Sequence, residues 1–399
     1  MHTGIRTRAE SAQTRKVLIC KSVLLQYSET FILEQLHSYA DWAPILVGLR
    51  RLEAGLPLER AQVLLLYGSK PTLLHDIIRK GLGEVGLSPP GFFKRLRQVG
   101  ASVVHTHFAT EAVAFWPVVR RLGCPLVVTL HGSDINIYRE SWERGERGFG
   151  NRRYPERVLS LSRNRNVYFV AVSNAIKRRA TEYGIPPERI TVRHTGIDLE
   201  RFTFSGVPVI ARRRRILFIG RFVEKKGGEY LLRAYARIRN GVPDAELTMV
   251  GDGPLRTRFE QIAVELQIPV RFPGALGAVQ VKREIDEARV LCLPSVTARN
   301  GDAEGFGMVL LEAQACGVPV VTSARGGAEE GVIDGKTGFA FAERDVDTLS
   351  ERLTRILTDD DLALSMSEEA RPFVKQRFDI RRCTRSLEQL YDEITGVVQ

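Results

Sequence analysis

The segment from Leu291 to Ser323 reads LCLPSVTARNGDAEGFGMVLLEAQACGVPVVTS and predicts a strand, a long loop, a helix and a second strand in succession. Its first apolar run, Val290–Leu293, stops at a proline, which is typical of a short buried strand in a parallel sheet. Gly305 and Gly307 precede the helix, and a Gly-Val-Pro turn ends it, because proline cannot continue a helix. The second strand follows over Val318–Thr322.

Two carboxylates flank the start of this helix. Glu304 is in the loop just before it, and Glu312 comes two helical turns after Gly305, on the face that points back toward the same crevice. A helix N-terminus flanked by glycines favours an anion such as a phosphate, and a carboxylate accepts hydroxyl hydrogen bonds from a sugar. The segment therefore indicates a ligand with both phosphate and sugar hydroxyls, although a plain strand–helix–strand unit with two acids would show the same residues.

A second segment adds two cations. Arg221 and Lys226 follow the predicted strand Ile216–Ile219 on a loop that glycines flank. Arginine offers a planar fork to phosphate oxygens, and lysine offers a point charge. Because both segments begin at strand ends of one sheet, we expect the cations and the helix N-terminus to converge on one diphosphate. Taken alone, this segment would more simply be interpreted as two surface bases.

Length, composition and charge limit the class of protein. The chain has 399 residues, of which 44% are hydrophobic and 8% aromatic, and this suits a globular protein of two domains. It contains no apolar run of the roughly 18 residues that a membrane span needs, and its polar N-terminal segment lacks the apolar core of a secretory signal. The net charge of +11 suits an anionic substrate or membrane surface. No nucleic-acid-binding motif accompanies it, so nucleic acid is not an expected partner.

The five cysteines are scattered and form no CxxC pair, so we expect buried free thiols in a reducing cytoplasm, with neither disulfides nor a metal site. They are Cys20, Cys124, Cys292, Cys316 and Cys383.

Strands and helices alternate along the chain, which predicts an α/β protein with doubly wound parallel sheets. A boundary at Thr203–Arg215 contains a glycine, a proline and four consecutive arginines. We therefore predict one domain over residues 1–205, a second over 206–375, and a C-terminal helical segment over 376–399.

Two histidines in the first domain follow predicted strands, at the sheet edge where open α/β sheets bind ligands. His131 is the stronger candidate, because Gly132 and Asp134 lie beside it, whereas His107 is more simply a structural histidine. The polar segment Tyr138–Glu156 predicts a long mobile surface loop able to cover a substrate.

Taken together, these motifs resemble the donor site of glycosyltransferase family 4, which comprises retaining enzymes of the GT-B fold. The resemblance rests on GRFVEKKG around Arg221 and Lys226, the VGDGP turn at Val250–Pro254, and Glu304 and Glu312 separated by seven residues. It implies two Rossmann-like domains that face a central cleft. The first would bind the acceptor, the second the nucleotide-sugar donor, and the last helix would cross back to the first.

The N-terminal half resembles the exopolysaccharide branch of that family, the colanic-acid and amylovoran types. This resemblance is carried by SETFILEQ, VHTHFA, LHGSDI and, later in the chain, PSVTARNGDAEG. The sequence departs from the family at Lys21–Glu29, where a glycine-rich turn is usual.

The family resemblance implies a role for each matching residue. Glu312 would bind the ribose, Glu304 the donor sugar, and Arg221 with Lys226 the diphosphate, while His131 would lie near the transferred sugar. The resemblance also places further residues at the donor: Gly220, Gly251, Gly253, Gly305, Phe306, Gly307, Met308 and Val309.

The implied activity is transfer of a sugar, with retention, from a nucleoside diphosphate sugar to a saccharide or lipid-linked saccharide in surface or exopolysaccharide biosynthesis. We expect no metal and no other cofactor, because Arg221 and Lys226 already neutralise the diphosphate, although Asp302-Ala303-Glu304 looks like a DxD metal motif. Two alternatives stay open, a GT-B sugar-nucleotide epimerase and a catalytically silent nucleotide-sugar-binding subunit of a polysaccharide assembly complex.

The missing signal and span and the positive charge predict a cytoplasmic protein, with an anionic membrane surface as a candidate partner at the inner face of the cell membrane. The segment Pro89–Gly100 combines apolar and basic side chains. It suits a membrane-surface helix or, as we slightly favour, an ordinary surface helix with its apolar side in the core. These side chains are Phe92, Phe93 and Leu96, beside Lys94, Arg95 and Arg97.

Overall fold

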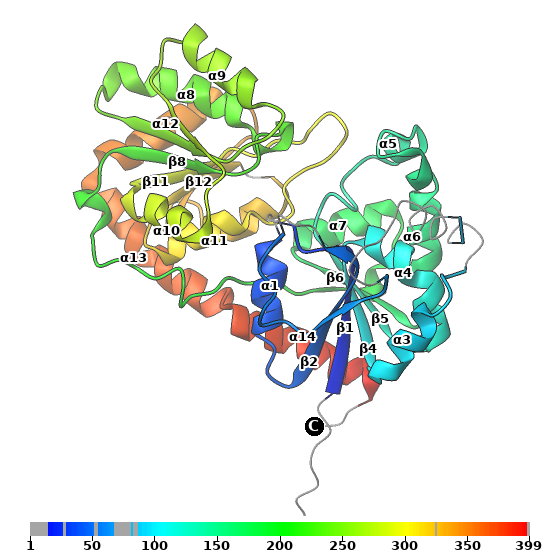
Figure 1. The fold of residues 1–399 in the computed structure, drawn as a ribbon. Helices are drawn as coiled ribbons and strands as arrows, with labels where there is room; N and C mark the ends of the chain where they lie inside the picture. The colour runs from blue at the N-terminus through cyan, green and yellow to red at the C-terminus, as the bar shows by residue number, and fades with distance from the viewer. Residues whose placement is uncertain are drawn as a thin grey trace, which may run out of the picture.

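The computed structural model describes residues 15–26, 29–51, 55–67, 81–82, 87–323 and 325–396. Within them the chain forms two α/β domains side by side (Figure 1). The first has a seven-stranded sheet in the order β3-β2-β1-β4-β5-β6-β7, and the second a six-stranded sheet in the order β10-β9-β8-β11-β12-β13. The strand pairs are parallel, which confirms the predicted doubly wound sheets.

The strands of the N-terminal domain are β1 (Arg15–Leu24), β2 (Trp42–Arg51), β3 (Val63–Leu65), β4 (Val103–His107), β5 (Leu126–Leu130), β6 (Val167–Ala171) and β7 (Ile190–Val192). Its helices are α1 (Thr30–His37), α3 (Phe92–Val99), α4 (Ala109–Leu122), α5 (Arg139–Glu143), α6 (Tyr154–Ser162) and α7 (Asn174–Tyr183), with short 3-10 turns η1 (Phe149–Asn151) and η2 (Pro187–Arg189). The central strands β4 and β5 are buried along their whole length, as strands covered on both faces must be.

The strands of the C-terminal domain are β8 (Arg215–Ile219), β9 (Glu246–Val250), β10 (Arg271–Gly274), β11 (Val290–Leu293), β12 (Val320–Ser323) and β13 (Gly338–Phe341). Its helices are α8 (Gly228–Gly241), α9 (Arg256–Glu265), α10 (Ala278–Glu287), α11 (Met308–Ala315), α12 (Val346–Thr358) and α13 (Asp360–Arg377), with 3-10 turns η3 (Val209–Ala211), η4 (Glu224–Lys226) and η5 (Gly326–Gly331). None of the helices that the structure describes is long and apolar enough to cross a membrane.

The last helix, α14 (Ile380–Thr395), leaves the C-terminal domain and packs on the first one (Figure 1). One carboxylate oxygen of Glu388 accepts the backbone N–H groups of Ala40, Asp41 and Trp42 at 3.0, 2.9 and 2.9 Å. Tyr391 is fully buried in the core of the N-terminal domain. The end of the chain is therefore a structural part of the N-terminal domain.

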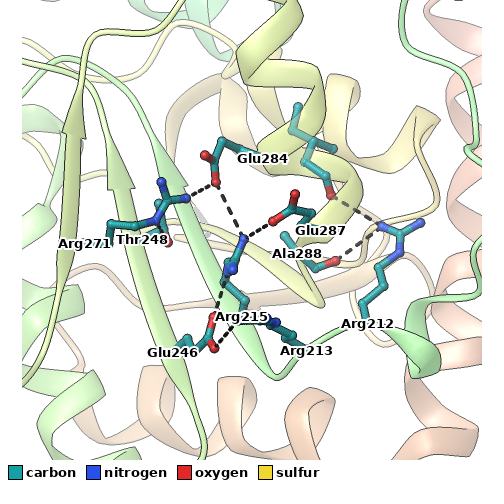
Figure 2. A network of polar contacts seen from close by, with 10 residues as sticks. Arg212, Arg213, Arg215, Glu246, Thr248, Arg271, Glu284, Glu287 and Ala288 are labelled. Atoms are coloured by element: carbon teal, nitrogen blue, oxygen red, sulfur yellow. Dashed lines mark hydrogen bonds and ion pairs between the residues drawn. The ribbon is translucent and has the colours of Figure 1, made fainter.

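The basic boundary segment fixes the position of two helices. Arg212 is buried and donates to the carbonyl oxygens of Ala288 at 3.3 Å and Cys316 at 3.2 Å, which are the C-terminal ends of α10 and α11. A guanidinium at these ends also opposes the partial negative charge of the helix dipoles. Figure 2 shows Arg215 beside it, between Glu246 at 3.0 Å and Glu287 at 2.6 Å. These two arginines are structural and form no open basic patch.

Two segments of the N-terminal domain bear on the sequence predictions. Tyr138–Glu156 was predicted to be a mobile loop, but it contains α5, η1 and the start of α6. Trp142 and Tyr154 anchor it, since both rings are buried and their centroids lie 4.3 Å apart. In α3, Phe92 and Leu96 are buried, so the apolar side of this helix packs in the core, as the favoured interpretation predicts.

Candidate active site

The loop that follows β8 is fixed against the end of β11. Gly227 has φ +65°, and a Cβ atom there would lie 1.8 Å from the carbonyl oxygen of Pro294, so only glycine permits this approach. The backbone N–H of Val296 donates to the carbonyl oxygen of Lys225 at 2.9 Å. The β8 loop and the loop between β11 and α11 are thereby held together.

This packing brings Lys226 to Glu304. Lys226 Nζ lies 2.5 Å from Glu304 Oε2, and Ser295 Oγ donates to the same oxygen at 3.3 Å. Burial alone would raise the pKa of Glu304, but Lys226 and then Lys225 outweigh it and lower the pKa to about 2. Glu304 is therefore a carboxylate at neutral pH, and Lys226 is oriented toward the start of α11.

The same loop touches the N-terminal domain through Gly305. A Cβ atom on Gly305 would lie 1.9 Å from the carbonyl oxygen of His131, and Ser173 Oγ donates to the carbonyl oxygen of Gly305 at 2.9 Å. Helix α11 begins at the next turn, with Gly307 as its N-cap at φ +81°. The first N–H groups of this helix lack intrahelical acceptors and suit an anion.

Glu312 is half-buried on α11 and has different surroundings. The charges of Glu34, on α1, and Arg201 act on it from the N-terminal domain. Arg201 Nη1 is already bound to Glu34 Oε1 at 2.5 Å. Burial and then the charge of Glu34 raise the pKa of Glu312 to about 7, although Arg201 opposes them. Glu312 can therefore gain or lose a proton near neutral pH.

His131 presents a neutral imidazole from the N-terminal domain. Its Nε2 lies 3.0 Å from Nδ1 of His107, and the rings of Phe31 and Phe108 pack at 4.9 and 4.6 Å. Burial, then the nearby charge of Lys21, lowers the pKa of His131 to about 3. At neutral pH His131 can form hydrogen bonds but does not carry a positive charge.

A buried charged cluster near His131 was missed by the sequence analysis. Lys21 Nζ lies 2.7 Å from Glu29 and 3.6 Å from Glu111, and it is 4.8 Å above the ring of Phe108. The lysine inside the apolar strand β1 was the available signal, because a buried lysine needs acidic partners. This cluster stands where the family's glycine-rich turn is missing.

Other predicted residues lie on the loops that follow β8 and β9. Arg221 is exposed, and the structure records no ion pair for it within the described residues. A Cβ atom on Gly251 would lie 1.9 Å from the carbonyl oxygen of Gly220, and one on Gly253 would lie 2.6 Å from that of Phe222. These glycines therefore allow the ends of β8 and β9 to pack closely.

The other residues at the start of α11 differ in what their side chains reach. Phe306 is buried against His194, with ring centroids 5.1 Å apart, and against Phe378 at 5.4 Å. Only its backbone can face a ligand in the cleft. Met308 and Val309 are partly buried in the first turn of α11, where their N–H groups lie at the helix start.

The acids of the DxD-like sequence are already occupied by lysines. Asp302 pairs with Lys225 at 3.1 Å, and Glu304 pairs with Lys226. Across the described part of the chain, no group of three or more His, Cys, Asp and Glu side chains is arranged to hold a metal ion.

The family of the chain follows from its two domains. Residues 203–373 match the family model described as Glycosyl transferases group 1, and residues 53–201 match the model described as Glycosyltransferase Family 4. The chain thus contains one region that matches each of these two glycosyltransferase models. The resemblance inferred from the paired glutamates and the basic loop is thereby confirmed.

Two named relatives are similar in sequence to parts of this chain. It is 33% identical over 228 residues to the putative colanic acid biosynthesis glycosyltransferase WcaL of Salmonella typhimurium, which covers 56% of each protein. It is 28% identical over 270 residues to the amylovoran biosynthesis glycosyltransferase AmsK of Erwinia amylovora, covering 67% of this chain and 64% of that protein. The matched regions thus span between about half and two thirds of these relatives.

Solved structures confirm the GT-B fold. The Anabaena protein HepE, crystallised with UDP, superposes with a TM-score of 0.76 at 19% identity over 95% of this chain and 100% of that one. A sucrose-phosphate synthase from Thermosynechococcus elongatus superposes with a TM-score of 0.76 at 19% identity over 96% of this chain and 100% of that one. At this identity the likeness concerns the fold alone.

Proposed function

We propose that this chain is a retaining hexosyltransferase that moves a sugar from a nucleoside diphosphate sugar to a saccharide or lipid-linked saccharide in surface or exopolysaccharide biosynthesis. The observation that carries the proposal is the Lys226–Glu304 ion pair at the start of α11, held opposite His131 by the contact of Gly305 with the N-terminal domain. The names of WcaL and AmsK, which refer to colanic acid and amylovoran, support the polysaccharide context.

The chemistry requires stabilisation of the leaving diphosphate. As the bond from the anomeric carbon to the phosphate oxygen breaks, negative charge grows on the diphosphate. Lys226, Arg221 and the N–H groups at the start of α11 would stabilise this charge most in the transition state. The acceptor oxygen bonds to the same face of the anomeric carbon, and its proton passes to the leaving phosphate oxygen. This step needs no separate protein base.

The remaining site residues would position the donor. The ionised carboxylate of Glu304 would accept hydroxyl hydrogen bonds from the sugar, and the neutral ring of His131 would contact that sugar from the opposite domain. Glu312 would bind the ribose. Because Glu304 holds Lys226 at 2.5 Å, an arriving diphosphate would share this lysine with the carboxylate.

The first experiment tests the donor class. HepE was crystallised with UDP and with UDP-glucose, and a Mycolicibacterium smegmatis relative, 36% identical over 175 residues, is named as GDP-mannose-dependent. A screen of nucleoside diphosphates for thermal stabilisation should therefore include both bases. We expect one diphosphate to raise Tm, and Lys226→Met to reduce that shift. No shift with any nucleotide would contradict the proposal.

A second experiment separates transfer from the alternatives. Release of nucleoside diphosphate from the matching sugar donor should depend on an added saccharide acceptor. Conversion of the donor sugar without an acceptor would instead identify an epimerase. Donor binding without turnover, across a panel of acceptors, would favour a silent binding subunit.

We also propose that transfer is independent of metal ions, since Arg221 and Lys226 supply the positive charge that a divalent cation would otherwise provide. Activity should survive EDTA. Full loss with EDTA, restored by Mg²⁺ or Mn²⁺, would contradict this part of the proposal.

For location, we propose a cytoplasmic enzyme that associates peripherally with the inner membrane face through its basic surface. In α3 this would involve Lys94 and Arg97 but not Arg95, whose guanidinium donates to the carbonyl oxygens of Leu65 and Leu66 at 3.0 and 2.9 Å. Exchange of Lys94 and Arg97 for glutamate should weaken binding to anionic vesicles, since each cation near the surface contributes about 1 kcal/mol. Unchanged vesicle binding would exclude α3 as the anchor.

A further inference from the structure

A pocket of about 350 Å³ lies between the two domains beside Glu304, within the roughly 300–1,000 Å³ typical of small-ligand sites. The N-terminal domain contributes the segment after β5 and the first turns of α7. The C-terminal domain contributes the loop before α11 and the residues that follow β12. The polar and aromatic lining residues that matter here are Asn136, Tyr138, Arg178, Arg179, Glu304 and Arg325.

The pocket is lined by more positive than negative side chains. Its two acids are already paired, because Glu182 lies 3.3 Å from Arg179 and Glu304 is bound to Lys226. Arg178 is exposed, and no carboxylate within the described residues lies at ion-pair distance from it. Arg325 reaches Glu343 only at 4.0 Å and is 64% exposed. The pocket therefore has two cations, one from each domain, available to an anion.

An aromatic ring on the pocket wall suits a sugar. Tyr138 is 44% exposed, and its backbone N–H donates to the carbonyl oxygen of Asn300 at 2.9 Å. A Cβ atom on Gly301 would lie 2.8 Å from the Tyr138 ring, so the loop before α11 supports one part of the ring. A fixed, half-open aromatic surface can pack against the apolar side of a sugar ring.

We propose that this pocket is an acceptor subsite for an anionic saccharide, with a carboxylate or phosphate of the acceptor bound between Arg178 and Arg325. The inference rests on the proposed function, and it adds the charge class of the acceptor. Arginine is suited to this task, because its fork binds both carboxylate and phosphate. Glu304 lines both this pocket and the donor side, so a sugar on Tyr138 would lie next to the transferred sugar.

The test measures binding with the donor site filled. Trigalacturonate, maltotriose and inorganic pyrophosphate are titrated calorimetrically into the whole chain, saturated with the nucleoside diphosphate that stabilises it most. We expect trigalacturonate to bind at least about tenfold more tightly than neutral maltotriose, because each charged hydrogen bond contributes about tenfold. Added salt should reduce this preference, since exposed charges are screened.

Variants test whether the two arginines of the pocket cause the preference for the anionic trisaccharide. Arg178→Gln combined with Arg325→Gln should remove the preference for the anionic trisaccharide and leave binding of maltotriose unchanged. Lys177→Gln is the matched control, because it removes one positive charge from the same helix but does not line the pocket. The control should keep the preference.

The outcomes are distinguishable. Equal binding of the two trisaccharides, or a preference that survives the double variant, would overturn the acceptor subsite. If pyrophosphate displaces trigalacturonate and binds more tightly, the anion is a phosphate; if it does not compete, the anion is a sugar carboxylate. Failure of every nucleoside diphosphate to bind would instead contradict the proposed function itself.

Discussion

Glu304 and Glu312 belong to one motif, separated by seven residues, yet their surroundings are electrically opposite. Glu304 meets a lysine from the neighbouring loop of its own domain, and its pKa falls to about 2. Burial and then the charge of Glu34, from the other domain, raise the pKa of Glu312 to about 7. Glu304 is therefore charged at neutral pH, whereas Glu312 titrates near neutral pH.

The charge state of each carboxylate thus depends on its burial and on the charged neighbours that the two domains supply. Lys226 and Glu304 lie on loops of the same sheet, so their pairing persists when the domains move apart. Glu34 reaches Glu312 only across the boundary between the domains. We therefore expect domain separation to lower the pKa of Glu312 and to leave that of Glu304 unchanged.

The largest expected effect comes from removing Lys226, the cation that pairs with Glu304. Lys226→Met should reduce kcat about 10²–10³-fold, because a charge that stabilises the transition state is lost. Lys225→Met is the control, since Lys225 pairs with Asp302 instead. Steady-state kinetics with the identified donor measure both. Equal losses in the two variants would show that the position of Lys226 is not special.

The next prediction separates the two glutamates. Glu312→Ala should weaken binding of the free nucleoside diphosphate about ten- to a hundredfold, since it removes hydrogen bonds of an ionised group. Glu304→Ala should leave that affinity nearly intact and reduce turnover of the sugar donor. Calorimetric titration beside steady-state kinetics measures both. The reverse pattern would mean that the assigned roles are exchanged.

The two variants should also differ in stability, because Glu304 is ion-paired. Glu304→Ala leaves Lys226 without its partner and should lower the free energy of unfolding by about 1–3 kcal/mol. Removing Glu312 relieves its repulsion with Glu34 and should not destabilise the protein at neutral pH. Denaturant unfolding distinguishes these outcomes, and equal stability of both variants would contradict the electrostatic difference.

The third prediction concerns pH. If the ionised form of Glu312 binds ribose, affinity for the free nucleoside should rise about tenfold from pH 6 to pH 8, as the carboxylate loses its proton near pH 7. The nucleoside is the probe because its ribose carries no titrating phosphate. Glu312→Gln should show a flat profile. A profile that stays steep in this variant would assign the titration to another group.

The free energy of unfolding should also depend on pH through these two carboxylates. The raised pKa of Glu312 means that the folded state binds the extra proton, so this residue costs stability as pH rises from the ordinary glutamate pKa of 4.5 toward 7. The lowered pKa of Glu304 contributes stability above pH 4.5, which is lost as pH falls toward 2.

The smallest expected effect comes from Glu34, whose charge helps to raise the pKa of Glu312. Glu34→Gln removes a negative charge beside Glu312 and leaves Arg201, whose charge lowers the pKa of Glu312. The midpoint of the nucleoside-binding profile should therefore move to lower pH, with a gain of a few-fold in affinity at pH 6. An unmoved midpoint would show that burial alone raises the pKa of Glu312.

Local patterns were enough to predict much of the molecule. The apolar run Val290–Leu293, which a proline ends, predicts the buried strand β11, because a fully covered strand needs a continuous apolar run. The sequence did not predict β10, a short partly exposed strand that contains a proline. It also missed the helices within Tyr138–Glu156, because their anchors, Trp142 and Tyr154, are isolated among charged residues.

The family motifs, the alternation of strands and helices, and the spacing of Glu304 and Glu312 can be read from the sequence, since they depend on residues close together in the chain. Which charges meet depends on the folded arrangement. Lys226 lies 78 positions from Glu304, and Glu34 comes to Glu312 from another domain. A carboxylate's pKa depends on burial and on charges within a few ångströms, and those neighbours are fixed only when the chain is folded.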